Sequence, residues 1–281
     1  MIKSLSAKDF KAVPYLESSA LMKAHKGKIV FSDEKPNVIV GPNGAGKSAV
    51  LTALAMRTLS YFIGESAFDD HYVIGNDSRE MWSEAEGWWR HDFVFLPGLT
   101  VETDNAPALY YRPNHIPGND DSVGAAMFCG YSAQAKAFLD KTDKKSSGQQ
   151  SRALMESMLE ALSGKLGLPA YKYVSWRSGK ELKDLKEQRH VNSFEYQFEI
   201  LKKMFAEVAP GAKLVVMMDE PEQSLDAKAR AQLWKAIAAA DCSKVQVIIA
   251  SHSSYPLRHP EKFNLIEAVP GYAQEVREME A

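Results

Sequence analysis

The sequence predicts an α/β protein with a mainly parallel core sheet flanked by helices, and three observations lead to this prediction. Strand-like apolar runs alternate with helical stretches in the last third of the chain, from Lys213 onward. The run at residues 37–40 is apolar at its end, which is typical of a strand buried on both faces. A glycine-rich turn follows this run directly and leads into a helical stretch, so strand, turn and helix come in the order of a phosphate-binding unit.

The amino-terminal residues predict short strands and one helix. Residues 2–10 alternate apolar and polar side chains imperfectly, and residues 28–31 are rich in β-forming types. We expect these two runs to form an antiparallel β region next to the core sheet. The helix is predicted to begin at Lys47 and to continue to about Ile63.

The middle of the chain predicts a smaller, strand-bearing subdomain at residues 64–164. Its strands are expected at residues 91–96, 109–111 and 125–129. A helix at residues 150–162 would end at Ser163-Gly164, because glycine commonly closes a helix. Residues 1–63 and 165–281 then form the core lobe.

The last third of the chain supplies the rest of that lobe. After a strand at residues 171–176 comes a charged helical region at 180–206, in which no heptad pattern is sustained. The alternating elements then follow: strand 213–218, helix 227–240, strand 245–250 and strand 263–268.

Composition excludes several classes of protein. The 281 residues are 45% hydrophobic and 25% charged, which is ordinary for a globular chain and not for a disordered or collagen-like one. No apolar run reaches the ~18 residues that a membrane helix needs, and the two cysteines fit a reducing compartment, so we expect a cytoplasmic protein without membrane insertion. The net charge of -2 means that nucleic-acid binding would need a local basic patch. Residues 141–145 could form such a patch or a solvated linker.

The most specific motif is the phosphate-loop pattern Gly-Pro-Asn-Gly-Ala-Gly-Lys-Ser at residues 41–48. Its glycines allow consecutive backbone N–H groups to turn toward an anion. Lys47 is expected beside the β- and γ-phosphates of a nucleotide, and the Ser48 hydroxyl on Mg²⁺. A glycine-rich turn arising by chance is disfavoured by the strand before it and the helix after it. The predicted nucleotide-binding residues are Asn43, Gly44, Ala45, Gly46, Lys47, Ser48 and Ala49.

A second motif is the apolar run 214–218 followed by Asp219 and Glu220. Ligands of open α/β sheets bind at the carboxyl ends of the strands, where these two carboxylates would lie. We expect Asp219 to hold Mg²⁺ through its outer shell and Glu220 to act as general base on the attacking water. The alternative is that both residues only start a turn before Pro221.

Three further motifs stand in order along the chain: Ser-Ser-Gly-Gln-Gln at residues 146–150, Ser-Leu-Asp at 224–226 and Ser-His-Ser at 251–253. Singly they have ordinary explanations, such as a polar helix cap or a structural histidine. Together with the first two motifs, their order and spacing resemble the ABC-type ATPases. In that family the five motifs are the Walker A loop, the signature, the Walker B strand with its glutamate, the D-loop and the switch histidine.

The resemblance implies an ABC-type head whose signature lies in the smaller lobe, and ATP hydrolysis with Mg²⁺. It implies that ATP is sandwiched between two copies of the chain, which therefore forms a homodimer through ATP. In each site one chain would supply the catalytic residues Lys47, Glu220 and His252, and the other would supply the signature residues Ser146, Ser147, Gly148 and Gln149. The D-loop residues Ser224 and Asp226 would lie near the dimer seam.

Within this superfamily the chain looks most like the SMC-like and RecF-like branch. The opening at residues 2–12 and the run Asp-Glu-Pro-Glu-Gln-Ser-Leu-Asp at 219–226 are similar to that branch, although long coiled-coil arms are absent. Such relatives act in DNA repair or recombination, or in bacterial and phage defence, which implies DNA or a separate effector or nuclease subunit as a partner. Gln134 is the only glutamine between Ser48 and Ser146, so it is the candidate Q-loop ligand of Mg²⁺, with a surface glutamine as the alternative.

Two other functions stay open at this point. A nucleotide-binding subunit of a membrane transporter would share every catalytic residue and differ in its partner. A scaffold that binds nucleotide without hydrolysing it is disfavoured, because Lys47 and Glu220 are both present.

Overall fold

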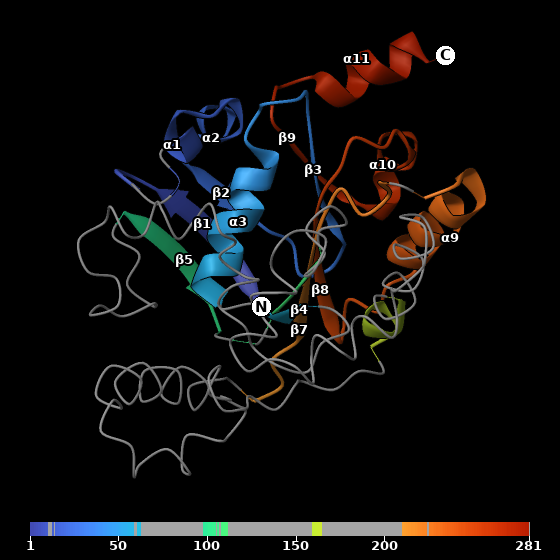
Figure 1. The fold of residues 1–281 in the computed structure, drawn as a ribbon, viewed down its shortest axis with the longest axis horizontal. Helices are drawn as coiled ribbons and strands as arrows, with labels where there is room; N and C mark the ends of the chain where they lie inside the picture. The colour runs from blue at the N-terminus through green and yellow to red at the C-terminus, as the bar shows by residue number, and fades with distance from the viewer. Residues whose placement is uncertain are drawn as a thin grey trace, which may run out of the picture.

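Two sheets with a helix between them form the framework of the molecule (Figure 1). The computed structural model describes residues 1–10, 13, 15–58, 61–62, 98–104, 106, 108–111, 159–164, 210–223 and 225–280. Within these residues, the strands form two sheets.

The larger sheet has six strands, and every pair of neighbours in it is parallel. In spatial order the strands are β4 (Tyr61–Phe62), β6 (Ala108–Tyr111), β7 (Leu214–Asp219), β8 (Val245–Ala250), β3 (Asn37–Val40) and β9 (Asn264–Glu267). Strands β3, β7 and β8 are buried along their whole length, as apolar strands covered on both faces should be. This confirms the predicted α/β class with a parallel core sheet.

The antiparallel region is a separate sheet of three strands. Its central strand β1 (Ile2–Ala7) pairs with β2 (Lys28–Val30) on one side and with β5 (Leu99–Thr103) on the other. The chain thus closes this sheet with a strand that lies nearly a hundred residues after β1.

The helices are mostly short. The helices that lie wholly within the described residues are α1 (Tyr15–Ser18), α2 (Ala20–Ala24), α3 (Lys47–Thr58), α9 (Ala227–Ala238), α10 (Tyr255–Arg258) and α11 (Tyr272–Met279), with a 3₁₀ turn η3 at Pro260–Lys262. Helix α3 lies between the two sheets, whereas α9 and α10 lie on the other side of the core sheet (Figure 1). Both faces of the core sheet are therefore covered by helices.

Two apolar clusters form on the two faces of the core sheet because side chains alternate along each strand. Val215 and Met217 of β7 join the cluster that holds α3 and β1. Val216 and Met218, one position along, join the cluster that holds Trp234 of α9. The strand that carries the Asp-Glu pair is thus anchored from both sides.

The structure corrects one predicted boundary and adds elements that the sequence did not predict. Helix α3 ends at Thr58 and does not reach Ile63, because residues 61–62 form β4 and pair with β6. Strand β5, the short helices α1, α2 and α10 and the terminal helix α11 were not predicted. The predicted helix end at Ser163-Gly164 is confirmed: residues 159–162 are helical, and Gly164 follows with a φ of 67°.

Several predicted elements fall outside the described residues: the strands at 91–96, 125–129 and 171–176 and the helical region at 180–206. The subdomain boundary at 64–164 stays a prediction, but two strands inside this range, β5 and β6, pair with β1 and β7 of the core. In the part of the chain that the structure describes, no helix is both long and apolar enough to cross a membrane.

Candidate active site

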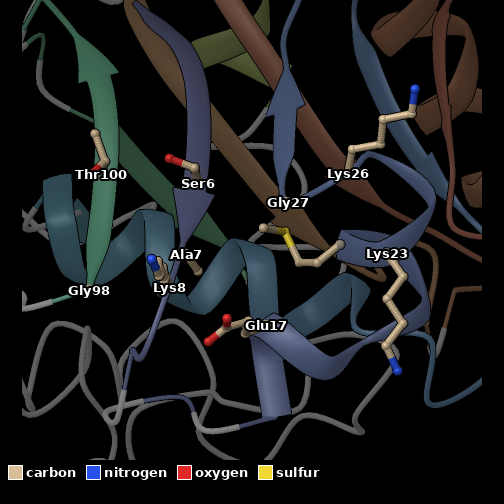
Figure 2. Close-up of a pocket in the computed structure, with 10 residues that line it drawn as sticks. Ser6, Ala7, Lys8, Glu17, Lys23, Lys26, Gly27, Gly98 and Thr100 are labelled. Atoms are coloured by element: carbon tan, nitrogen blue, oxygen red, sulfur yellow. The ribbon is translucent and has the colours of Figure 1, made fainter.

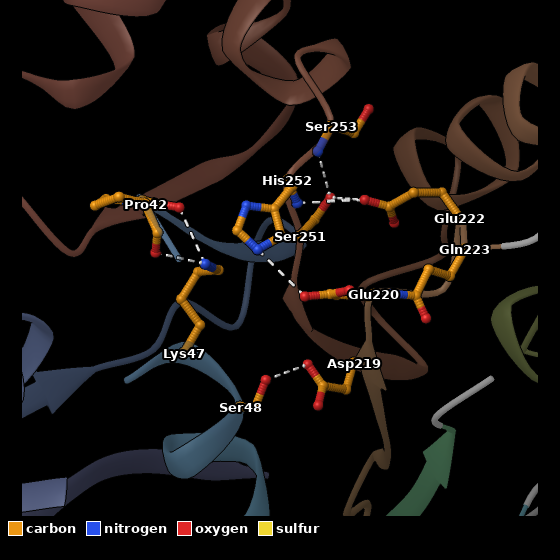
Figure 3. A network of polar contacts seen from close by, with 11 residues as sticks. Pro42, Lys47, Ser48, Asp219, Glu220, Glu222, Gln223, Ser251, His252 and Ser253 are labelled. Atoms are coloured by element: carbon orange, nitrogen blue, oxygen red, sulfur yellow. Dashed lines mark hydrogen bonds and ion pairs between the residues drawn. The ribbon is translucent and has the colours of Figure 1, made fainter. Parts of the chain in front are cut away.

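Three loops meet at the carboxyl ends of three neighbouring parallel strands. Strand β3 leads into the glycine-rich loop at 41–46, β7 into Asp219 and Glu220, and β8 into Ser251 and His252. Because these strands are adjacent in the order β7-β8-β3, their ends bring together residues that lie up to about two hundred positions apart in the sequence. Figure 3 shows the resulting network of polar contacts.

The glycine-rich loop is held by close backbone packing. Gly46 has a φ of 100°, and a Cβ there would lie 2.5 Å from the Cβ of Ser19. The loop is also bonded to α2, since the Leu21 N–H donates to the carbonyl of Ala45 at 3.0 Å. Gly44 has a φ of 73° at the exposed side of the loop. The backbone angle favours glycine at both positions, and at Gly46 the contact with Ser19 leaves no room for a Cβ.

The other predicted nucleotide-binding residues divide between the open and the buried side of this loop. Asn43 and Gly44 are exposed, whereas Ala45 and Ala49, the latter in the first turn of α3, are buried in the core. The helix begins directly after the loop, and the first helical bond runs from the Val50 N–H to the carbonyl of Gly46 at 3.1 Å. The amino end of a twelve-residue helix thus adjoins the loop, which favours an anion there.

Lys47 lies inside this loop with only 5% of its surface exposed. Its Nζ donates to the carbonyls of Gly41 and Pro42, each at 3.0 Å (Figure 3). Burial lowers the pKa of Lys47, although the nearby carboxylates of Glu220, Asp219 and Glu222 act in the opposite direction. A partly desolvated ammonium surrounded by acceptors is suited to bind phosphate oxygens.

Ser48 and Asp219 form the candidate site for Mg²⁺. The Ser48 hydroxyl donates to Oδ1 of the buried Asp219 at 2.9 Å. Within the described ranges, no group of three or more His, Cys, Asp or Glu side chains could hold a metal ion by itself. One hydroxyl and one carboxylate nevertheless suit Mg²⁺, which keeps several waters and takes its remaining ligands from substrate phosphates. The residues present therefore fit Mg²⁺ together with a nucleotide and do not fit a metal cage of protein ligands alone.

Glu220 sits in a strained turn and is held at both carboxylate oxygens. Its φ is 48°, and its backbone N–H donates to the carbonyl of Ala250 at 2.8 Å. Its Oε2 accepts from the Gln223 amide at 2.8 Å, and its Oε1 lies 3.2 Å from Nε2 of His252. A left-handed backbone at a residue other than glycine is uncommon and is often found at functional sites. The structure thus brings Glu220 and His252 into direct contact.

Glu222 belongs to the same network and was not assigned a role from the sequence. Its Oε1 accepts hydrogen bonds from the hydroxyl of Ser251 and from the backbone N–H of His252, the latter at 3.3 Å. Burial raises the pKa of Glu222, which the hydrogen bond from Ser251 partly offsets. In the sequence, Glu222 is only a third carboxylate two residues after Glu220. The pattern does not indicate which way its side chain points.

Asp226 is explained by local structure. Its carboxylate accepts from the Ala229 N–H at 2.8 Å and caps the amino end of α9. Its predicted place at a dimer seam stays a prediction. The other residue of that motif, Ser224, lies outside the described residues, as do the predicted signature residues Ser146, Ser147, Gly148 and Gln149 and the candidate Mg²⁺ ligand Gln134.

A separate hollow of about 670 Å³ lies beside the antiparallel sheet (Figure 2). Among the side chains that line it are three exposed lysines, Lys8, Lys23 and Lys26, and one carboxylate, Glu17. Glu17 accepts a hydrogen bond from the backbone N–H of Asp9 at 2.7 Å. The part of the chain that the structure describes places no carboxylate in an ion pair with any of these three lysines, so the hollow has a net positive lining.

Comparison with known proteins adds a likeness to solved structures. No protein-family model and no curated protein matches the sequence. Among solved structures, the chain is similar to the ATP-binding cassette MJ0796, described as a dimeric post-hydrolysis state bound to ADP and Pi. The two chains are 16% identical, the match covers 80% of this chain and 78% of the other, and the TM-score is 0.24. The function proposed below therefore rests on the residues of the site.

Proposed function

We propose that the chain is an ATPase of the ABC type that binds ATP with Mg²⁺ and hydrolyses it to ADP and phosphate. The observation that supports this most is the meeting, on three adjacent strand ends, of a phosphate-binding loop with its lysine, a hydroxyl–carboxylate pair and a glutamate in contact with a histidine. Each group has a separate task in phosphoryl transfer, and no task requires a residue from elsewhere in the described chain.

The tasks follow from the geometry. Lys47 and the loop N–H groups bind and orient the β- and γ-phosphates. Ser48 and Asp219, which are hydrogen-bonded to each other, would hold Mg²⁺, and the ion would neutralise charge on the phosphates. Glu220 accepts the proton of the attacking water, and the contacts from Gln223 and His252 keep its carboxylate oriented.

The experiment that tests this proposal compares the wild-type protein with Glu220→Gln. Phosphate release from ATP and Mg²⁺ should fall by ~10²–10⁴-fold, because the amide cannot accept the proton, while ATP binding persists. Glu275→Gln is the matched control, since it replaces the same carboxylate by the same amide at an exposed position of α11. Equal hydrolysis by wild type and Glu220→Gln would remove Glu220 from the role of base, and no hydrolysis by the wild type would refute the ATPase.

We further propose that two copies sandwich ATP, with Ser146 and Gly148 of one copy facing the Lys47 loop of the other. The order of the motifs supports this arrangement, because the chain holds one copy of each motif and so cannot close a composite site alone. The sites would then close and open with ATP binding and hydrolysis. Sedimentation with and without a non-hydrolysable ATP analogue measures this directly.

For the pathway, we propose DNA repair or recombination, or defence against phage, with DNA as the partner. Beyond the resemblance in the motifs, the specific support is the lysine-lined hollow, which offers a local basic surface on a chain of nearly balanced charge (Figure 2). Backbone phosphates are bound through such charges, and the binding weakens steeply with salt. For the alternative function, a transporter subunit, no DNA binding is expected at this surface.

Lys23→Glu tests the DNA partner, with Lys235→Glu as control. Both are exposed helix lysines, but Lys235 lies on α9, on the other side of the core sheet. DNA binding and any stimulation of ATP hydrolysis by DNA should fall in the first variant and stay at the wild-type level in the second. Equal DNA binding by both variants would exclude the hollow as the contact.

A further inference from the structure

Glu222 connects the two loops that hold the candidate catalytic pair. It follows Glu220 by two residues, yet its side chain points to the neighbouring loop after β8 (Figure 3). There its Oε1 accepts from the Ser251 hydroxyl and from the backbone N–H of His252. The carboxylate is therefore bonded to the backbone of the same residue whose ring contacts Glu220.

The burial of the Glu222 carboxylate is energetically unfavourable, which suggests that its hydrogen bonds serve the function of the site. Its Oε2 is fully buried and, among the residues that the structure describes, has no hydrogen-bond partner. Burying a carboxylate oxygen without a partner costs free energy, which an apolar side chain of similar volume would avoid. No described cation forms an ion pair with Glu222, so charge pairing does not account for it.

The contacts form a closed ring. From the Glu220 backbone the chain passes through Pro221 to the Glu222 carboxylate, across to the His252 N–H, and through the imidazole back to the Glu220 carboxylate. Ser251 connects this ring of contacts to β3, the strand that leads to the phosphate loop, because its N–H donates to the carbonyl of Ile39 at 3.2 Å. A displacement of the loop after β8 would therefore move the ring of His252 relative to Glu220.

We propose that Glu222 is a positioning residue that fixes the loop after β8 and thereby holds His252 against the candidate base Glu220. Its carboxylate acts through His252 and does not itself contact the substrate. The effect on catalysis rests on the proposed function, whereas the effect on the His252–Glu220 contact does not.

The test compares Glu222→Met with Glu222→Gln. Methionine preserves much of the volume but removes both acceptor oxygens, whereas glutamine retains one oxygen that can accept the same two bonds. Glu275→Met on the exposed face of α11 is the matched control for the methionine change. Two quantities are measured: kcat and KM for ATP, and the NMR chemical shifts of the ring nitrogens of His252 in ¹⁵N-histidine-labelled protein.

Glu222→Met should lower kcat by about 10- to 100-fold with little change in KM, because a misplaced group affects the reaction more than ground-state binding. It should also move the His252 ring shifts in the direction seen in Glu220→Gln. Glu222→Gln should restore both readouts close to wild type. Ser251→Ala removes one of the two donors and should give a smaller change in the same direction, which keeps the test open if the methionine variant does not fold.

Unchanged His252 shifts in Glu222→Met, or in Ser251→Ala if that variant alone folds, would overturn the proposal. Equal losses of kcat in Glu222→Met and Glu222→Gln would overturn it too, because the retained acceptor would then be irrelevant. If the wild-type protein hydrolyses no ATP while the His252 shifts respond as expected, the proposed function fails and the positioning role stands.

Discussion

Replacing Gly46 by alanine should destabilise the protein more than the same change at Gly44, although both glycines lie in one loop. Both have positive φ angles, 100° and 73°, which an alanine adopts only at a cost. They differ in their surroundings. A Cβ at Gly46 would lie 2.5 Å from the Cβ and 2.7 Å from the Oγ of Ser19, whereas a Cβ at Gly44 would meet nothing within 4 Å.

The expected losses of stability are the sum of two terms, the backbone strain and the close contact of the new methyl group. Backbone strain alone costs roughly 1–2 kcal/mol and applies to both variants. Forcing a methyl group against a buried neighbour adds about 1–3 kcal/mol at Gly46. The free energy of unfolding should therefore fall by about 1–2 kcal/mol in Gly44→Ala and by about 2–5 kcal/mol in Gly46→Ala.

A second substitution separates the two terms. Ser19→Gly removes both atoms that the new methyl would meet, and as an amino-terminal cap of α2 glycine is only a few tenths of a kcal/mol worse than serine. The double variant Gly46→Ala with Ser19→Gly should therefore recover most of the packing term and be about as stable as Gly44→Ala.

Urea denaturation followed by circular dichroism measures the wild type and the four variants, including Ser19→Gly alone as the control. Equal losses in Gly44→Ala and Gly46→Ala would refute the packing term. The same conclusion would follow if Ser19→Gly failed to restore stability to Gly46→Ala.

Three further predictions concern the site. Lys47→Ala should weaken ATP binding measured by calorimetry, since the buried ammonium of the phosphate loop is lost; unchanged affinity would contradict its role. Ser146→Arg should leave ATP binding to the monomer intact but block ATP-dependent dimers, and normal dimers in sedimentation would argue against the two-chain arrangement. Glu222→Gln should raise the melting temperature at neutral pH and less so near pH 4. The reason is that the raised pKa of Glu222 in the folded state stabilises the protein at low pH, and this contribution is lost as the pH rises through that pKa. An equal gain at both pH values would exclude this linkage.

The sequence by itself predicted the strands and the helix that carry the phosphate loop, the Asp-Glu pair and the Ser-His pair, but not the role of Glu222. The phosphate loop could be recognised because its function depends on local backbone geometry, which glycines at fixed spacing encode. The central strands that follow it were predictable because burial on both faces favours mainly apolar runs, as in β7 and β8.

The sequence did not determine elements whose stability comes from distant partners. Residues 61–62 extend an apolar helical pattern in the sequence, but they form a strand that pairs with β6. Strand β5 alternates between half-buried and exposed positions and is held by β1. Helices α1 and α2 have four and five residues, too few to show a helical period.

Only the tertiary structure decided which of the candidate residues touch. The strand order β7-β8-β3 is a property of the whole sheet, and it places the Asp-Glu pair beside the Ser-His pair and the phosphate loop. No local pattern in the sequence encodes the left-handed backbone of Glu220 or the direction of the Glu222 side chain, which bonds to the loop after β8. A motif depends on residues that are close in the sequence, so the sequence alone can show it. Contacts across strands depend on the packing of the whole sheet, which exists only in the folded protein.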